Sequence, residues 1–120
     1  FGHTLGHAIE SYFLESKTKN NLTHGEAIAI GLICETYLSH KVLHLQKEKV
    51  IEVKNMMSAI YKKIVIETSD YDAIFSLLKH DKKNSNGQVN FVLLRDFEDF
   101  QLDCTISNEL LKESIDFYNS

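Results

Sequence analysis

The chain has 120 residues, the size of one ordinary domain. Apolar residues make up 43% and charged residues 25% of it, which is typical of a soluble globular protein and excludes a disordered or fibrous chain. The net charge of −4 argues against nucleic acid as a partner, because phosphate binding needs a concentrated basic face.

The first predicted helix covers residues 2–14. Three of its polar residues, His3, His7 and Glu10, follow the spacing i, i+4 and i+7. Side chains at this spacing lie on one face of a helix, so we expect the three to be neighbours. A polar loop over residues 16–21 then separates this helix from the next one.

The second predicted helix covers residues 24–42 and starts directly after Thr23. Thr23 and Glu26 have the spacing of a capping box, in which each side chain bonds a free backbone N–H of the new helix. Residues 27–34 are apolar all the way round the helix. A helix of this kind is buried on every face, and we expect the same here.

The remainder of the chain completes a mainly α, multi-helical domain with one small β-hairpin. The evidence is apolar spacing of helical period, alternation of strand period and turn residues between the segments. The predicted elements are, in chain order, a helix over 47–61, an extended link over 63–67, a helix capped by Asp70, antiparallel strands over 88–94 and 99–106, and a last helix capped by Ser107.

Three of the six histidines, His3, His7 and His24, are candidates for chemistry. Each has a glycine beside it, which lets a ligand or another backbone approach closely. His24 stands at a helix start, where the dipole favours the neutral imidazole that binds metal. A catalytic zinc site takes three protein ligands, and Glu10 or Glu26 is available as a further one, although the capping box already explains Glu26. On spacing alone, these residues could equally be satisfied polar groups at a helix interface.

Cysteine usage and hydropathy bear on the compartment. Cys34 and Cys104 lie far apart and are predicted to be free, buried thiols in a reducing environment. The sequence shows no signal peptide and no apolar stretch of transmembrane length. We therefore expect a cytoplasmic location without a membrane partner, while a targeting segment upstream of Phe1 stays open.

Three segments carry a recognisable pattern, in the order "FGHTLGHAIE" (1–10), "LTHGEAIAIGL" (22–32) and "HDKKNSNGQVNFVLL" (80–94). Together they resemble the signature of the 3-dehydroquinate synthase family, which belongs to the sugar-phosphate cyclase superfamily. The resemblance covers the chain from its first residue to about residue 94. The tail is less distinctive.

The resemblance implies that residues 1–120 are the C-terminal, metal- and substrate-binding helical domain of an enzyme. An N-terminal Rossmann-like NAD domain would lie outside this chain, so the chain alone is expected to be inactive. Enzymes of the family convert the sugar acid phosphate DAHP into 3-dehydroquinate and phosphate, in the shikimate pathway of aromatic amino acid biosynthesis. They use NAD⁺ and Zn²⁺ or another divalent metal such as Co²⁺. A homodimer is consistent with the family.

Residue roles follow from the resemblance by position. His3 and His24 match the two histidine ligands of the catalytic metal, and the third ligand is a glutamate upstream of this chain. His7 matches the catalytic histidine that contacts the phosphate end of the substrate and assists proton transfer. In this interpretation Glu10 is a structural residue.

The third segment supplies a substrate-binding lysine. Lys82 or Lys83 matches the family lysine, and Lys82 is preferred. After "FVLL" the family usually has an Ile-Gly pair, whereas this chain continues with "RDFEDF" (95–100), so we expect a different hairpin turn.

Two alternatives to this function stay open. The first is another sugar-phosphate cyclase, such as 2-deoxy-scyllo-inosose synthase. The second is a non-catalytic helical interaction module that has kept its ancestor's motifs. The genomic sequence before Phe1 would separate the second alternative from an enzyme, because an enzyme requires the upstream NAD domain.

Overall fold

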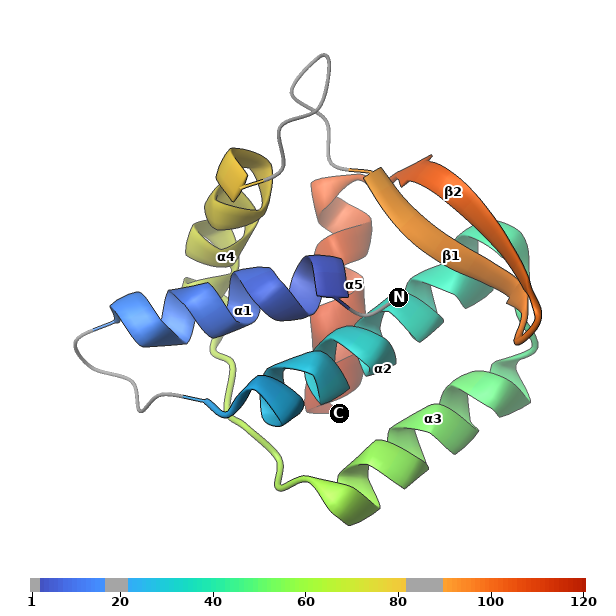
Figure 1. The fold of residues 1–120 in the computed structure, drawn as a ribbon, viewed down its shortest axis with the longest axis horizontal. Helices are drawn as coiled ribbons and strands as arrows, with labels where there is room; N and C mark the ends of the chain where they lie inside the picture. The colour runs from blue at the N-terminus through green and yellow to red at the C-terminus, as the bar shows by residue number, and fades with distance from the viewer. Residues whose placement is uncertain (1–2, 17–21, 82–89) are drawn as a thin grey trace.

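The structure, a computed structural model, describes residues 3–16, 22–81 and 90–120. Within these residues the chain is mainly helical with one two-stranded antiparallel sheet, as the sequence predicts (Figure 1). The elements are, in chain order, α1 (His3–Glu15), α2 (His24–Leu43), α3 (Lys47–Ile60), α4 (Thr68–Asp81), β1 (Asn90–Asp96), β2 (Asp99–Thr105) and α5 (Asn108–Asn119).

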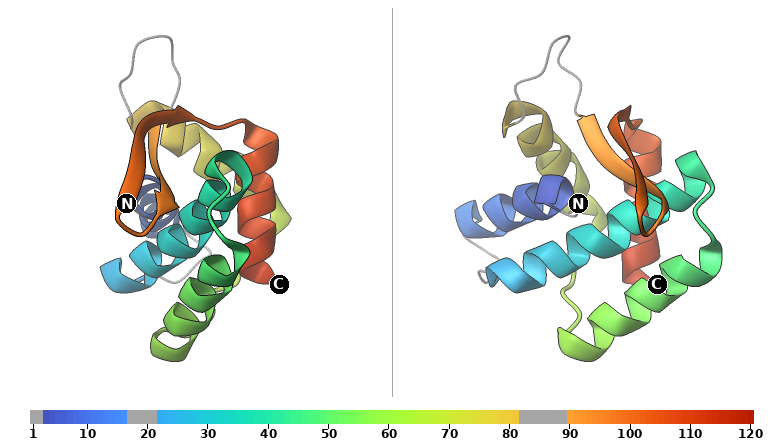
Figure 2. Two further views of the ribbon diagram at one scale, coloured as in Figure 1. Left: turned by 90° about the vertical axis from the view of Figure 1, so that its right-hand side faces the viewer. Right: turned by 45° about the vertical axis from the view of Figure 1, so that its right-hand side comes forward.

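Helix α2 runs through the middle of the fold. It contacts α1, α3, α5 and β1, and Figures 1 and 2 show these elements arranged around it. The apolar run at its start is buried as predicted, except that Ile28 and Leu32 are half-buried. These two residues line a hollow between α2 and α3. The expectation of burial on every face is therefore wrong for this one stripe of the helix.

The start of α2 forms the predicted capping box. The Thr23 hydroxyl accepts the N–H of Glu26 at 3.1 Å, and the Glu26 carboxylate accepts the N–H of Thr23 at 2.9 Å. This backbone hydrogen bond from Thr23 lowers the pKa of Glu26. The Oε1 atom of Glu26 thus serves the start of the helix.

The hydrophobic core joins α1, α2, α4, α5 and β1 in a single cluster. Its largest fully buried aliphatic and aromatic side chains are Leu5, Ile9, Ile30, Leu38, Ile74, Leu78, Phe91, Leu93 and Ile115. Helix α3 contributes no buried residue to this cluster, and only its partly buried Val53 and Met57 pack against it.

Helix α4 begins earlier than predicted. Its first residue is Thr68, so Asp70 lies inside the first turn instead of capping it from outside. The Asp70 carboxylate still serves the helix start, because it accepts the N–H of Glu67 at 2.8 Å. It also accepts the Tyr12 hydroxyl at 2.5 Å, which joins α4 to α1.

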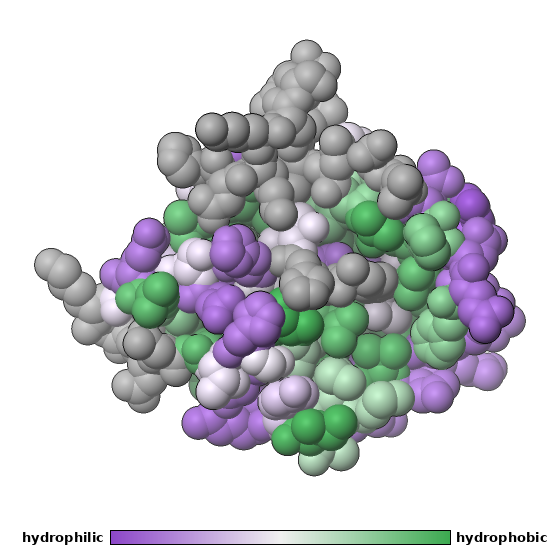
Figure 3. All heavy atoms as spheres, in the orientation of Figure 1, coloured by the Kyte–Doolittle hydropathy of each residue, from purple (hydrophilic) through white to green (hydrophobic). Residues whose placement is uncertain are grey.

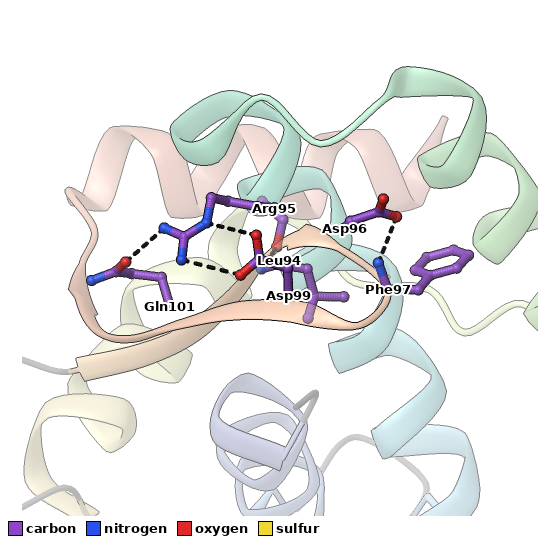
Figure 4. Close-up of polar contacts among 7 residues, drawn as sticks. Leu94, Arg95, Asp96, Phe97, Asp99 and Gln101 are labelled. Carbon is purple, nitrogen blue, oxygen red and sulfur yellow. Dashed lines mark hydrogen bonds and ion pairs between the residues drawn. The ribbon is translucent and has the colours of Figure 1, made fainter.

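The hairpin forms with the divergent turn sequence. The Arg95 guanidinium donates to both carboxylate oxygens of Asp99 at 3.1 Å and to Gln101 at 2.8 Å (Figure 4). At the turn, the Asp96 carboxylate accepts the N–H of Phe97 at 2.8 Å. These side-chain bonds hold the turn between β1 and β2 in this chain.

The two cysteines differ in environment. Cys34 is fully buried and its thiol donates to the carbonyl of Ser114 at 3.5 Å. Burial raises the pKa of this thiol, so it stays protonated and unreactive. Cys104 is also a free thiol but is only half-buried, which corrects the expectation of two buried thiols. It lies on β2, opposite Phe91 of β1.

No helix in the described part of the chain combines the length and apolar character that a membrane span requires.

Candidate functional site

Helix α1 presents a polar face opposite its buried one. Leu5, Ile9 and Phe13 are buried in the core, at 0%, 0% and 3% exposure. His7 on the other side is exposed, and Glu10 keeps 27% of its side-chain surface exposed. His3 is the first residue of α1, but its side chain lies outside the described residues. The predicted shared face is confirmed for His7 and Glu10.

Gly6, next to His7, allows α1 and α2 to cross at close range. A Cβ atom on Gly6 would lie 2.9 Å from the carbonyl oxygen of Ala27 and 3.2 Å from the Cα of Ile28. Both atoms belong to the backbone of α2, so neither can move aside. The sequence predicts that this glycine lets a ligand or another backbone approach closely, and the structure shows the backbone of α2 there.

Gly25, next to His24, has a different neighbour. A Cβ atom there would lie 3.0 Å from the hydroxyl oxygen of Tyr61 and 3.1 Å from its ring. Tyr61 follows α3, so Gly25 lets the end of α3 pack against the first turn of α2. Gly6 and Gly25 therefore allow the close helix packing that positions the backbone of His7 and of His24.

His24 and Glu10 meet across the junction of α1 and α2. The Nδ1 atom of His24 lies 3.1 Å from the Oε1 atom of Glu10, although the residues are 14 apart in the sequence. The imidazole remains 64% exposed, so it can reach a ligand outside this chain. Spacing alone left Glu10 as a further metal ligand or a structural residue; the structure shows it bound to a candidate ligand.

Glu35, which the sequence analysis missed, fixes the start of α1. Its side chain is 1% exposed, and its Oε2 atom accepts the N–H of Leu5 at 3.1 Å. The N–H groups in the first turn of a helix have no partner within it, so this carboxylate supplies one. Because His3 and His7 lie on either side of Leu5, Glu35 positions the backbone that carries both. The sequence does carry a signal for this residue, because Glu35 is a charged residue directly after the apolar run of residues 27–34.

One turn further along α2, Ser39 accepts a backbone N–H of the hairpin, as Glu35 does for α1. Its hydroxyl is fully buried, accepts the N–H of Leu94 at 2.9 Å and donates to the carbonyl of Glu35 at 2.8 Å. Helix α2 therefore sets the placement of α1 and of β1 from adjacent turns. Lys82 and Lys83, the predicted substrate-binding residues, lie outside the described residues.

An apolar hollow lies beside His24, between α2 and α3. Figure 3 shows apolar side chains gathered over the middle and lower part of the face seen in Figure 1, with hydrophilic ones along its right-hand edge. The residues that line the hollow are His24, Gly25, Ile28, Ala29, Leu32, Met57, Ile60 and Tyr61. Its walls carry little polar chemistry apart from the imidazole.

The donor set suits a divalent metal that accepts nitrogen ligands. Imidazoles are typical ligands of Zn²⁺ and Co²⁺, and the imidazole of His24, one of the two predicted ligands, is exposed. Among the side chains that the structure describes, no three of the types His, Cys, Asp and Glu come together.

Comparison with known proteins gives the family. A family model described as the 3-dehydroquinate synthase C-terminal domain matches residues 1–84. A 3-dehydroquinate synthase of Parabacteroides distasonis is 40% identical over 119 residues, covering 98% of this chain and 33% of that protein. The enzyme of the same name from Picrophilus torridus is 33% identical over 113 residues, covering 93% of this chain and 31% of that protein.

A solved structure shares the fold. The crystal structure of 2-deoxy-scyllo-inosose synthase, complexed with carbaglucose-6-phosphate, NAD⁺ and Co²⁺, superposes with a TM-score of 0.74 and 28% sequence identity. The match covers 96% of this chain and 33% of that one. The chain thus spans about a third of the length of the relatives it matches. On the family match and these relatives, the chain belongs to the 3-dehydroquinate synthase C-terminal family.

Proposed function

We propose that this chain is the C-terminal domain of a 3-dehydroquinate synthase, which converts DAHP into 3-dehydroquinate and phosphate in the shikimate pathway. The observation that carries the proposal is the match of the family model to residues 1–84, which contain all three candidate histidines. An N-terminal NAD-binding domain would complete the enzyme. Its cytoplasmic location and its assembly as a homodimer stay predictions.

In this proposal, His3 and His24 hold the catalytic metal together with a glutamate from the N-terminal part of the full-length enzyme. Zn²⁺ is our preferred metal, and the Co²⁺ bound by the related cyclase supports a divalent ion of this kind. When bound, such an ion acts as a Lewis acid on substrate hydroxyl groups. The His24 imidazole at the start of α2 is exposed and oriented through Nδ1, which fits this role.

His7 and a lysine of the 82–83 pair would act on the phosphate end of the substrate. His7 is exposed on the same face of α1 as Glu10, so it can donate to a phosphate oxygen or take a proton near it. A cationic lysine would stabilise the negative charge that develops as phosphate leaves. Both roles require only side chains of this domain.

The test is phosphate release from DAHP in the presence of NAD⁺ and Zn²⁺. We expect turnover by the full-length protein and none by the 120-residue chain. The domain lacks the nucleotide site and one metal ligand in this proposal. Turnover by the domain alone would overturn this division of the active site, and a full-length protein inactive on DAHP would overturn the substrate.

A second candidate is a different sugar-phosphate cyclase. The observation in its favour is the similarity to 2-deoxy-scyllo-inosose synthase at 28% identity, which is lower than the 40% identity to a 3-dehydroquinate synthase. The same assay on the full-length protein with a panel of sugar phosphates in place of DAHP separates the two. We expect DAHP to be the preferred substrate.

A further inference from the structure

We infer that Glu10 is a positioning residue for metal binding: its carboxylate holds the His24 imidazole in the orientation and tautomer that present Nε2 to the ion. This inference rests on the proposed function, in which His24 is a metal ligand. It assigns to Glu10 a role that neither its spacing nor the family pattern had indicated.

The tautomer follows from the chemistry of the pair. The Oε1 atom of Glu10 lies 3.1 Å from the Nδ1 atom of His24. An ionised carboxylate can only accept hydrogen bonds, so the proton of this bond belongs to Nδ1. In the neutral imidazole the lone pair then lies on Nε2, so Nε2 is the nitrogen that can coordinate a metal.

The arrangement matches a known design of metal sites. Histidines that bind metals usually donate their other ring N–H to a carboxylate or carbonyl, which fixes the ring and raises its basicity. Glu26, the acidic residue nearest to His24 in the sequence, is held by the N–H of Thr23. Glu10 reaches His24 from a different helix, so the orientation of the ring depends on how α1 and α2 pack.

A purely structural role explains the pair poorly. His24 is 64% exposed, and even an exposed pair of full charges contributes only about 0–1 kcal/mol to stability. The two helices are already joined by the close crossing at Gly6 and by the buried bond from Leu5 to Glu35. The bond between Glu10 and His24 therefore adds little to the packing, whereas it decides which nitrogen faces outward.

The first measurement is the tautomer of His24 in the metal-free full-length protein. Nitrogen-15 NMR of the imidazole distinguishes the two forms, and the spectrum of His24→Ala assigns the signal. We expect the Nδ1–H form in the wild-type protein and a loss of that preference in Glu10→Ala. A wild-type imidazole protonated on Nε2 would overturn the inference. This readout does not depend on metal or on activity.

The second measurement is Zn²⁺ affinity, by calorimetry on the same full-length protein. We expect Glu10→Ala to weaken binding by about 10–100-fold, the usual effect of losing such a partner. Glu10→Gln keeps an oxygen acceptor for the Nδ1–H and should lose less. Glu15→Gln is the matched control, because it removes the same charge from an exposed position at the end of α1. It should bind Zn²⁺ like the wild type.

The outcomes separate this inference from the proposed function. If His24→Ala weakens Zn²⁺ binding and Glu10→Ala does not, the positioning role is wrong and the ligand stands. If His24→Ala has no effect, both the ligand and the positioning role are wrong. If both variants weaken binding in a protein that does not act on DAHP, the positioning role stands and the proposed reaction is wrong.

Discussion

Helices α1 and α3 both lie against α2, but they are held in different ways. Helix α1 buries Leu5, Ala8, Ile9 and Phe13, and α2 approaches its backbone directly at Gly6. Helix α3 has Val50 as its one buried residue. The helix that carries the candidate histidines is thus packed tightly against α2. Helix α3, which carries none of them, buries far less of its surface.

Polar contacts show the same contrast. In α1, the N–H of Leu5 donates to the carboxylate of Glu35, which is buried at 1% exposure. Helix α3 is held by lysines at the surface: Lys49 pairs with Asp96 of the hairpin, and Lys54 donates to the carbonyl of Phe117 at 2.6 Å. Water competes for the hydrogen bonds and ion pairs of such lysines, so these contacts fix a helix less firmly than a buried hydrogen bond does.

The largest effect is expected from one substitution made in both regions. Ile9→Ala on α1 removes a side chain with 0% exposure and should lower the free energy of unfolding by about 2–5 kcal/mol. Ile60→Ala on α3 removes one that is 64% exposed, so its effect should stay within about 0.5 kcal/mol. Urea denaturation of the 120-residue chain measures both. Equal losses would remove the contrast between the helices.

Glu35→Ala is expected to rank second. It leaves the N–H of Leu5 buried without its acceptor, which costs about 1–3 kcal/mol. Glu35→Gln keeps an acceptor oxygen in the same place and should lose less. Denaturation gives the stabilities, and hydrogen exchange at Leu5 reports the bond itself. Unchanged protection of that amide in Glu35→Ala would show that the start of α1 is held by something else.

Gly6→Ala is expected to come third. The new Cβ would meet the backbone of α2 at 2.9 Å, and overpacking of this kind costs about 1–3 kcal/mol. A gain in helix propensity of about 1 kcal/mol offsets part of the loss. Gly25→Ala is the control, because the ring of Tyr61 can move where backbone cannot. A less stable Gly25→Ala than Gly6→Ala would contradict this account of the crossing.

The smallest effect is expected at the start of α2. Thr23→Ala removes the helix cap and should cost about 1 kcal/mol. Because the Thr23 backbone N–H lowers the pKa of Glu26, the ionised Glu26 stabilises the fold above its ordinary pKa. This contribution is lost as the pH falls through the lowered value. Glu26→Gln should therefore approach wild-type stability in acid, and a constant difference across pH would contradict the capping box.

The sequence was sufficient for those features that depend on neighbours along the chain. The capping box of Thr23 and Glu26 and the shared face of His7 and Glu10 depend only on helical spacing, and both are confirmed. The alternation of apolar and polar residues predicts the two strands of the hairpin. It does not predict the contacts at the turn, because the bonds of Arg95 to Asp99 and Gln101 depend on the register of the two strands.

Contacts between distant residues were beyond the reach of the sequence. Glu35 lies 30 residues from Leu5, and His24 lies 14 residues from Glu10. Spacing identifies the face of a helix but not the partner that the face meets. The partner depends on how α1 crosses α2, which Gly6 decides by allowing a close approach. Family resemblance supplied the roles of the histidines, and the structure adds the groups that orient them.

The central claim is that the junction of α1 and α2 binds the catalytic metal. The most direct test is calorimetric titration of Zn²⁺ into the full-length protein and into His3→Ala, His24→Ala and His44→Asn. His44 is exposed at the opposite end of α2 in the left-handed conformation that asparagine tolerates, so it is a matched control. We expect weakened binding in the first two variants and wild-type binding in the third. Identical titrations in all four proteins would contradict it.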